Sequence, residues 1–229
     1  MPNFFFILFY GGYSTRPNFK IQVTLQALQT RMNFLAHAYL SFNNSHLLVG
    51  NMLGDFVKGP ALHHFSASIQ QGMQLHRFID KYTDQHPSFL ATKALYRVAS
   101  PLGAGIFADM VFDHCLAANN QYFTEPQLAA FAQHVYQQLP MSHPHTPPTA
   151  LEFFKAMQQH NWLLHYRSEE GIARAMHNMC RRYPRIGQAE PVLKRFAETR
   201  ADAQHHFSQF FPELEDACQT EIQRLSTKR

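Results

Sequence analysis

The sequence predicts an all-α fold, a single-domain helical bundle, on three observations. Glycine and proline are sparse and cluster between longer segments, for example in "VKGP" (57–60) and "RRYPRIG" (181–187). Between these breaks, apolar residues recur every three or four positions, which is the period of one helix face. Few stretches alternate apolar and polar residues, and β-branched residues are rare, so the signals of strands are weak.

The helical period is clearest in five segments, which are 66–82, 102–118, 126–138, 149–166 and 189–210. The segment 140–148 contains four prolines and is predicted to be a long loop. With the shorter stretches included, the pattern predicts about eight to ten helices. The 229 residues, of which 45% are hydrophobic, are enough for one well-buried core, and no break in composition marks a second domain.

The start of the chain differs in character from the rest. "FFFILFY" (4–10) resembles the core of a signal peptide, but no positive charge precedes it and no clear small-residue cleavage site follows. Met32 opens a more orderly sequence, so we expect residues 1–31 to be an N-terminal extension and 32–229 to be the domain. No apolar run approaches the roughly 20 residues that span a bilayer. The scattered cysteines (Cys115, Cys180 and Cys218) suit a reducing cytoplasm.

Two stretches place acids and histidines at helical spacing. In "LHRFIDKYTD" (75–84), His76 and Asp80 are four positions apart, so a helix directs both to the same side. In "FADMVFDHCLA" (107–117), Asp109 and Asp113 have the same spacing, and His114 follows about 100° around the helix. The second stretch is otherwise apolar, so its charges carry a large desolvation cost unless they are paired or bind a cation.

Two further stretches add isolated polar residues to apolar surroundings. "GNMLGDFVKG" (50–59) contains Asp55, and "NFLAHAYLS" (33–41) contains His37. Several such acids and histidines without cysteine partners favour a site for Mn²⁺, Fe²⁺ or Mg²⁺ over a structural zinc site. A carboxylate-rich site of this kind can activate water and neutralise phosphate oxygens.

Each residue also has a plainer interpretation. His37 alone is typical of a hydrogen-bonded core histidine, His76 with Asp80 fits an ordinary surface pair, and Asp109 fits the solvated side of a helix. Neighbouring histidines carry little information, because the chain has 15 of them. The joint pattern indicates a metal site more strongly than any one member does.

Four of these stretches occur in an order that resembles the acyl-carrier-protein phosphodiesterase family, which is related to the HD-domain metal phosphohydrolases. They are "MNFLAHAYLS", "GNMLGDFVKG", "LHRFIDKYTDQHP" and "DMVFDHCLA". The likeness continues through "NWLLHYR" (161–167), "MCRRYPRI" (179–186) and "FSQFFP" (207–212), and so covers most of the chain from Met32 onward. The resemblance implies an HD-like helical fold and a phosphodiesterase domain over residues 32–229.

The resemblance also implies an activity. It is the hydrolysis of the phosphodiester that joins 4′-phosphopantetheine to a serine of holo-acyl carrier protein, with Mn²⁺ as cofactor and Mg²⁺ or Fe²⁺ as substitutes. The implied metal ligands are Asp55, His76, Asp80, Asp113 and His114, with His37 and Asp109 as weaker candidates. Asp55 would be needed for catalysis, and Arg77 would bind the phosphate. Ordinary HD enzymes have a His-Asp doublet where this chain has Asp113-His114, which leaves the roles of the individual ligands open.

The charge of the chain fits an acidic carrier protein as partner, with no nucleic acid or membrane expected. The pI is about 9.0, and residues 167–200 contain eight lysines and arginines against four glutamates. Two other functions stay open: hydrolysis of a nucleotide or other small phosphodiester, and binding by a non-catalytic helical module. Trp162 and Tyr166 would either line a pantetheine channel or belong to the core.

Overall fold

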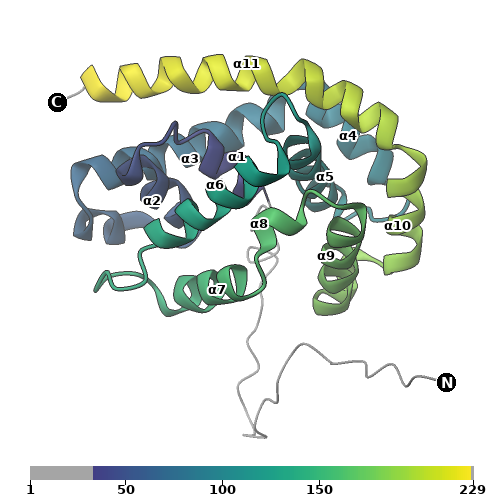
Figure 1. The fold of residues 1–229 in the computed structure, drawn as a ribbon, viewed down its shortest axis with the longest axis horizontal. Coiled ribbons are helices and arrows are strands. Elements are labelled where there is room, and N and C mark those ends of the chain that lie inside the picture. Colours follow the sequence, from purple (N-terminus) through teal and green to yellow (C-terminus); the bar gives the residue numbers. More distant parts are fainter. Residues whose placement is uncertain (1–32, 228–229) are drawn as a thin grey trace, which may run out of the picture. The chain divides into compact units, whose positions relative to one another are not determined.

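The computed structural model describes residues 33–227, which consist of helices and connecting turns without a strand (Figure 1). The predicted all-α fold is therefore confirmed for this part of the chain. The expected extension, residues 1–31, lies outside the described residues, so its separation from the domain stays a prediction.

The helices follow one another with short connections. In chain order they are α1 (Phe34–Tyr39), α2 (Ser45–Leu53), the 3₁₀ helix η2 (Gly59–His64), α3 (Ala67–Gln85), α4 (Pro87–Tyr96), α5 (Ala104–Ala118), α6 (Glu125–Gln138), α7 (Pro148–Gln159), α8 (Trp162–His165), α9 (Glu169–Arg182), the 3₁₀ helix η3 (Pro184–Ile186), α10 (Ala189–Glu198) and α11 (Arg200–Thr227). The long loop predicted at 140–148 is the connection between α6 and α7.

Polar side chains begin several helices at the expected places. The side chain of Asn44 accepts hydrogen bonds from the backbone N–H groups of His46 and Leu47, at 3.1 Å each, and so caps α2. Thr124 and Gln127 form a capping box at the start of α6. The predicted helix starts agree with the structure to within two residues for α3, α5 and α6, and the capping box accounts for this agreement at α6.

Two of the predicted segments are each divided into two helices. The segment 149–166 breaks at Asn161, which has a left-handed backbone (φ 45°) between α7 and α8. The segment 189–210 breaks at Thr199, whose hydroxyl donates to the carbonyl of Arg195 and ends α10. Neither break contains glycine or proline, the residues on which the predicted boundaries depended.

Helices α2 and α3 pack with their backbones unusually close. A Cβ atom on Gly50 would overlap the carbonyl oxygen of Ile69, and one on Gly72 would overlap the carbonyl oxygen of Leu47. Only glycine permits this approach. It brings the residues after Gly50 on α2 close to the apolar and acidic side chains of α3.

Helix α11 lies along α3, α4 and α5 (Figure 1). It buries Phe207, Phe210 and Phe211, and Phe210 contacts Phe89 of α4 and Phe112 of α5. With 28 residues, α11 is the longest of the described helices. Neither it nor any other helix within residues 33–227 has both the length and the apolar character that crossing a bilayer requires.

Candidate metal centre

Four of the predicted side chains come together from three parts of the fold. His37 lies on α1, Asp55 follows the end of α2, and His76 and Asp80 lie one turn apart on α3. Nε2 of His37 is 3.4 Å from Oδ1 of Asp80, and Nε2 of His76 is 3.4 Å from Oδ2 of the same residue. Nε2 of His76 is also 3.5 Å from Oδ1 of Asp55. The two imidazole rings stack, with 4.2 Å between their centroids.

Asn51 on α2 fixes the orientation of both histidines. Its side-chain Oδ1 accepts a hydrogen bond from Nδ1 of His37 at 2.7 Å, and its backbone carbonyl accepts one from Nδ1 of His76 at 2.8 Å. The amide orientation is set because Nδ2 of Asn51 donates to the carbonyl of His37 and to the hydroxyl of Ser41. Each histidine therefore carries its proton on Nδ1 and presents the lone pair of Nε2.

These two lone pairs face carboxylates, which also carry only lone pairs. Nε2 of His37, Nε2 of His76 and Oδ2 of Asp55 are buried and make no hydrogen bond within the described residues. Buried polar atoms without partners are costly, and negative atoms that face one another repel. A cation between them would remove both costs, so the arrangement is that of a candidate metal centre.

The surroundings shift the pKa values of His37 and His76 in opposite directions. Burial lowers the pKa of His37, and His76 lowers it further, although Asp80 acts the other way. Burial also lowers the pKa of His76, but Asp55 and Asp80 outweigh it and raise this pKa above its ordinary value. The two acids thus draw positive charge to Nε2 of His76, either as a proton or as a metal ion.

The chemistry of the donor set fits a divalent cation. One ligand atom each from His37, His76 and Asp80 can be chosen so that all lie within 4.8 Å of one another, a separation that one bound ion can bridge. Asp55 adds a carboxylate at the edge of this group. Mixed nitrogen and oxygen ligands without thiolate suit Mn²⁺, Fe²⁺ or Mg²⁺. The side chains of Asp55 and Asp80 are 10% and 19% exposed, so solvent reaches the acids and not the imidazoles.

Asn51 was not among the residues predicted from the sequence. The signal was present, because a fully buried asparagine among Gly50, Met52 and Leu53 must find polar partners. The prediction considered only residues that can bind a metal directly, and a residue that orients the ligands has no such marker.

Replacing Asn51 by alanine is expected to weaken Mn²⁺ binding by about 10- to 100-fold, because both imidazoles lose the group that orients them. Titration calorimetry with Mn²⁺ measures this change. Ser41→Ala is the matched control, since Ser41 contacts Asn51 but neither imidazole ring. Equal Mn²⁺ affinity in Asn51→Ala and in the unchanged protein would contradict the orienting role.

Asp113 has different contacts from those expected of a metal ligand. It is fully buried on α5, and its two oxygens accept hydrogen bonds from the backbone N–H groups of Leu35 and Ala36, at 2.9 Å each. Burial raises the pKa of Asp113 to about 8, while these two hydrogen bonds act in the opposite direction. Asp113 therefore holds the first turn of α1, the helix that carries His37, and supports the site through that helix.

Replacing Asp113 by alanine is expected to lower the free energy of unfolding by about 2–4 kcal/mol, because two buried N–H groups lose their acceptor. Urea unfolding followed by circular dichroism gives this value. Asp202→Ala, which removes an exposed carboxylate from the first turn of α11, should change it by about 0.5 kcal/mol or less. A similar small effect of both substitutions would argue against the anchoring role.

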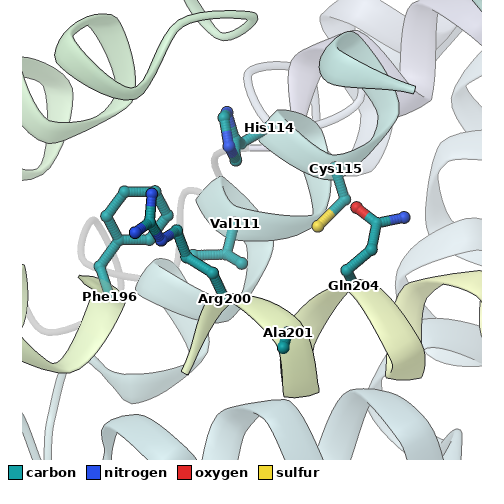
Figure 2. Close-up of a pocket in the computed structure, with 7 residues that line it drawn as sticks. All are labelled: Val111, His114, Cys115, Phe196, Arg200, Ala201 and Gln204. Atoms are coloured by element: carbon teal, nitrogen blue, oxygen red, sulfur yellow. The ribbon is translucent and has the colours of Figure 1, made fainter. Parts of the chain in front are cut away.

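Three other predicted residues, His114, Asp109 and Arg77, do not belong to the group of His37, Asp55, His76 and Asp80. His114 donates from Nδ1 to the carbonyl of Tyr166 at 2.7 Å. It lines a cavity of about 330 Å³ across from Phe196 and Arg200 (Figure 2), and burial lowers its pKa. Asp109 is buried one turn before Asp113 on α5. Arg77 is exposed and donates to the carbonyl of Val57 at 3.3 Å, two residues after Asp55.

Several basic residues of the segment 167–200 form hydrogen bonds or ion pairs within the protein. Arg167 donates to the carbonyls of Ala117 and Phe123, at 2.7 and 3.0 Å, and thereby holds the end of α5. Arg200 pairs with Glu169, and both Lys194 and Arg195 contact Glu198. Further exposed arginines on α9 and η3 include Arg174, Arg182, whose guanidinium lies over the ring of Tyr183, and Arg185. The segment does have an excess of basic residues. Because several of them pair within the protein, fewer are available to attract a partner than the count suggests.

The chain is similar to known proteins over most of its length. The family model described as acyl carrier protein phosphodiesterase matches residues 32–214. Relatives with that name come from Photorhabdus laumondii, 31% identical over 182 residues, which are 79% of this chain and 92% of the relative, and from Enterobacter sp. strain 638, 31% identical over 185 residues, 80% and 95%. A relative from Salmonella agona is 31% identical over 156 residues, 68% and 81%. No solved structure matches the chain.

Proposed function

The chain belongs to the acyl carrier protein phosphodiesterase family, and on that premise we propose that it hydrolyses the phosphodiester between 4′-phosphopantetheine and the serine of holo-acyl carrier protein. The family resemblance predicted from the motifs is thereby confirmed. The observation that carries the proposal is the pair of histidine Nε2 atoms that face Asp55 and Asp80 in a buried group. Their arrangement supports a metal centre of the kind that such a hydrolysis needs.

We assign His37, His76 and Asp80 as the metal ligands, with Asp55 beside them. The proposed cation is Mn²⁺, with Mg²⁺ or Fe²⁺ as alternatives for the same donors. When bound, the cation supplies positive charge that neutralises phosphate oxygens and makes water more acidic.

In the proposed reaction, Asp55 accepts a proton from the attacking water, because its Oδ2 makes no hydrogen bond within the described residues and its side chain is partly accessible. The oxygen of that water bonds to phosphorus, the bond between phosphorus and the serine oxygen breaks, and the serine oxygen takes up a proton. Arg77 lies close to the Asp55 segment through its bond to Val57, and from there its guanidinium would bind a phosphate oxygen. The products are apo-carrier protein and 4′-phosphopantetheine.

Mass spectrometry tests the reaction class directly. Purified protein is incubated with Mn²⁺ and holo-acyl carrier protein, and the carrier is expected to lose the mass of phosphopantetheine while the chelated sample does not change. No loss with Mn²⁺, Mg²⁺ or Fe²⁺ would contradict the proposal. Hydrolysis of bis(p-nitrophenyl) phosphate without cleavage of the carrier would favour a small phosphodiester as the substrate.

The basic residues that do not serve the fold support an acidic protein as partner. We propose that Arg174, Arg182 and Arg185 attract the acidic carrier protein, because long-range charge attraction speeds the encounter of oppositely charged proteins. Excess free carrier protein should displace carrier protein that is bound to this chain, whereas DNA of equal charge should not.

The free, buried thiols of Cys115, Cys180 and Cys218 support the cytoplasm as the proposed location.

A further inference from the structure

A cluster of aromatic side chains adjoins the candidate metal centre. Phe153 of α7 is at its middle, with its ring centroid 4.7 Å from that of Phe34, 5.5 Å from that of Phe56 and 5.3 Å from that of Trp162. Phe34 is buried, whereas Phe56, Phe153 and Trp162 are only half-buried. Three large aromatic side chains of the cluster are therefore partly open to solvent.

Two members of this cluster are close in sequence to residues of the candidate metal centre. Phe56 follows Asp55 directly, and Phe34 lies one turn before His37 on α1. Phe153 contacts both of them, so α7 places its aromatic side chain against residues that are next to Asp55 and His37 along the chain. The core residues in the same region differ clearly, since Phe154 and Tyr166 are 0% and 2% exposed.

We propose that Phe56, Phe153 and Trp162 form an apolar wall that binds the pantoyl part of the phosphopantetheine arm. This inference rests on the proposed function. In that arm, a carbon bearing two methyl groups is separated from phosphorus by only one oxygen and one methylene. With the phosphate at the metal centre, the methyl groups therefore lie next to it, where the wall begins.

The wall makes the enzyme selective for this arm among phosphodiesters. Burying two methyl groups against aromatic rings corresponds to a factor of about 10 in binding. A phosphodiester with a plain carbon chain would meet the same metal and the same carrier protein but would lose that factor. Trp162, the single tryptophan of the chain, contacts Phe153 and so reports on occupancy of the wall.

The test compares two carrier proteins, one with the natural arm and one whose arm lacks the two methyl groups. We expect kcat/KM to be about 10-fold higher for the natural arm, and this ratio to fall to about 3-fold or less in Phe153→Ala and in Trp162→Ala. The ratio does not depend on the fraction of folded enzyme, because both substrates are measured with the same preparation. Phe89→Leu is the control, because Phe89 is buried against Phe112 and Phe210 and has no ring contact with the wall within the described residues. It disturbs the core and should leave the ratio unchanged. An unchanged ratio in both wall variants would overturn the inference.

Fluorescence separates this inference from the proposed function. Free 4′-phosphopantetheine is expected to change the emission of Trp162, whereas inorganic phosphate at the same concentration is not. If no carrier protein is cleaved but this difference is seen, the wall is retained and the proposed hydrolysis is wrong. If the carrier is cleaved but the methyl groups affect neither the rate nor the emission, the hydrolysis is retained and the wall is wrong. If neither cleavage nor an emission change occurs, both are wrong.

Discussion

Asp80→Asn is expected to lower kcat/KM by roughly 1,000-fold or more while the fold persists. Among the acids of residues 33–227, Asp80 is the one whose two oxygens approach the Nε2 atoms of both His37 and His76, at 3.4 Å each. The amide keeps the size of the side chain but loses its negative charge. It also directs an N–H₂ group toward one side of the site, where it repels a cation. The effect on stability should be small, because the Asp80 side chain is partly exposed.

The measurement combines steady-state kinetics with the metal content of the purified variant. Asp84→Asn is the matched control, because Asp84 lies one turn further along α3 and is exposed. The control should retain both the metal and the activity. If Asp80→Asn keeps its bound metal and its rate, Asp80 is not a ligand and the centre has to be assigned to other residues.

The spacing of His76 and Asp80 was the most reliable part of the sequence prediction. Their side chains meet because four positions on a helix amount to about one turn, which is a local property of the chain. The approach of His37 and Asp55 to the same pair could not be derived from spacing. It depends on the close packing of α2 on α3 at Gly50 and Gly72, which no local pattern encodes.

Asp113 shows why desolvation alone does not identify a ligand. An acid among Met110, Val111, Phe112 and Cys115 must have a partner, and the sequence prediction took that partner to be a metal. The structure supplies two backbone N–H groups from α1 instead. Both partners satisfy a buried carboxyl group, and the choice between them depends on which helix end lies opposite, a matter of tertiary packing.

The same reasoning explains the success and the limit of the fold prediction. Apolar periodicity and proline-rich breaks predicted the helical class and the loop after α6, because both are local. The divisions at Asn161 and Thr199 were missed, since an asparagine or a threonine ends a helix only where its backbone or hydroxyl finds a suitable partner.

Gly54→Ala is expected to reduce activity by roughly 100-fold although it adds only one methyl group. Gly54 ends α2 with helical backbone angles (φ −54°, ψ −35°), so alanine causes no strain of its own there. Its Cβ atom would lie 2.6 Å from Cβ of His76 and would overlap Cγ and Cδ2 of that ring. The ring cannot turn aside without breaking its hydrogen bond to the carbonyl of Asn51, and Nε2 would move away from Asp55 and Asp80.

Kinetics and Mn²⁺ titration of Gly54→Ala measure this displacement. Gly105→Ala on α5 is the control, because its Cβ would meet only Lys93 at 3.6 Å and alanine should stabilise that helix slightly. A second variant separates the clash from general damage. Removing both the ring and Cβ in Gly54→Ala/His76→Gly should restore the melting temperature toward that of His76→Gly without restoring activity. Full activity in Gly54→Ala would mean that His76 can move freely, and a histidine with that freedom is not held in place as a metal ligand.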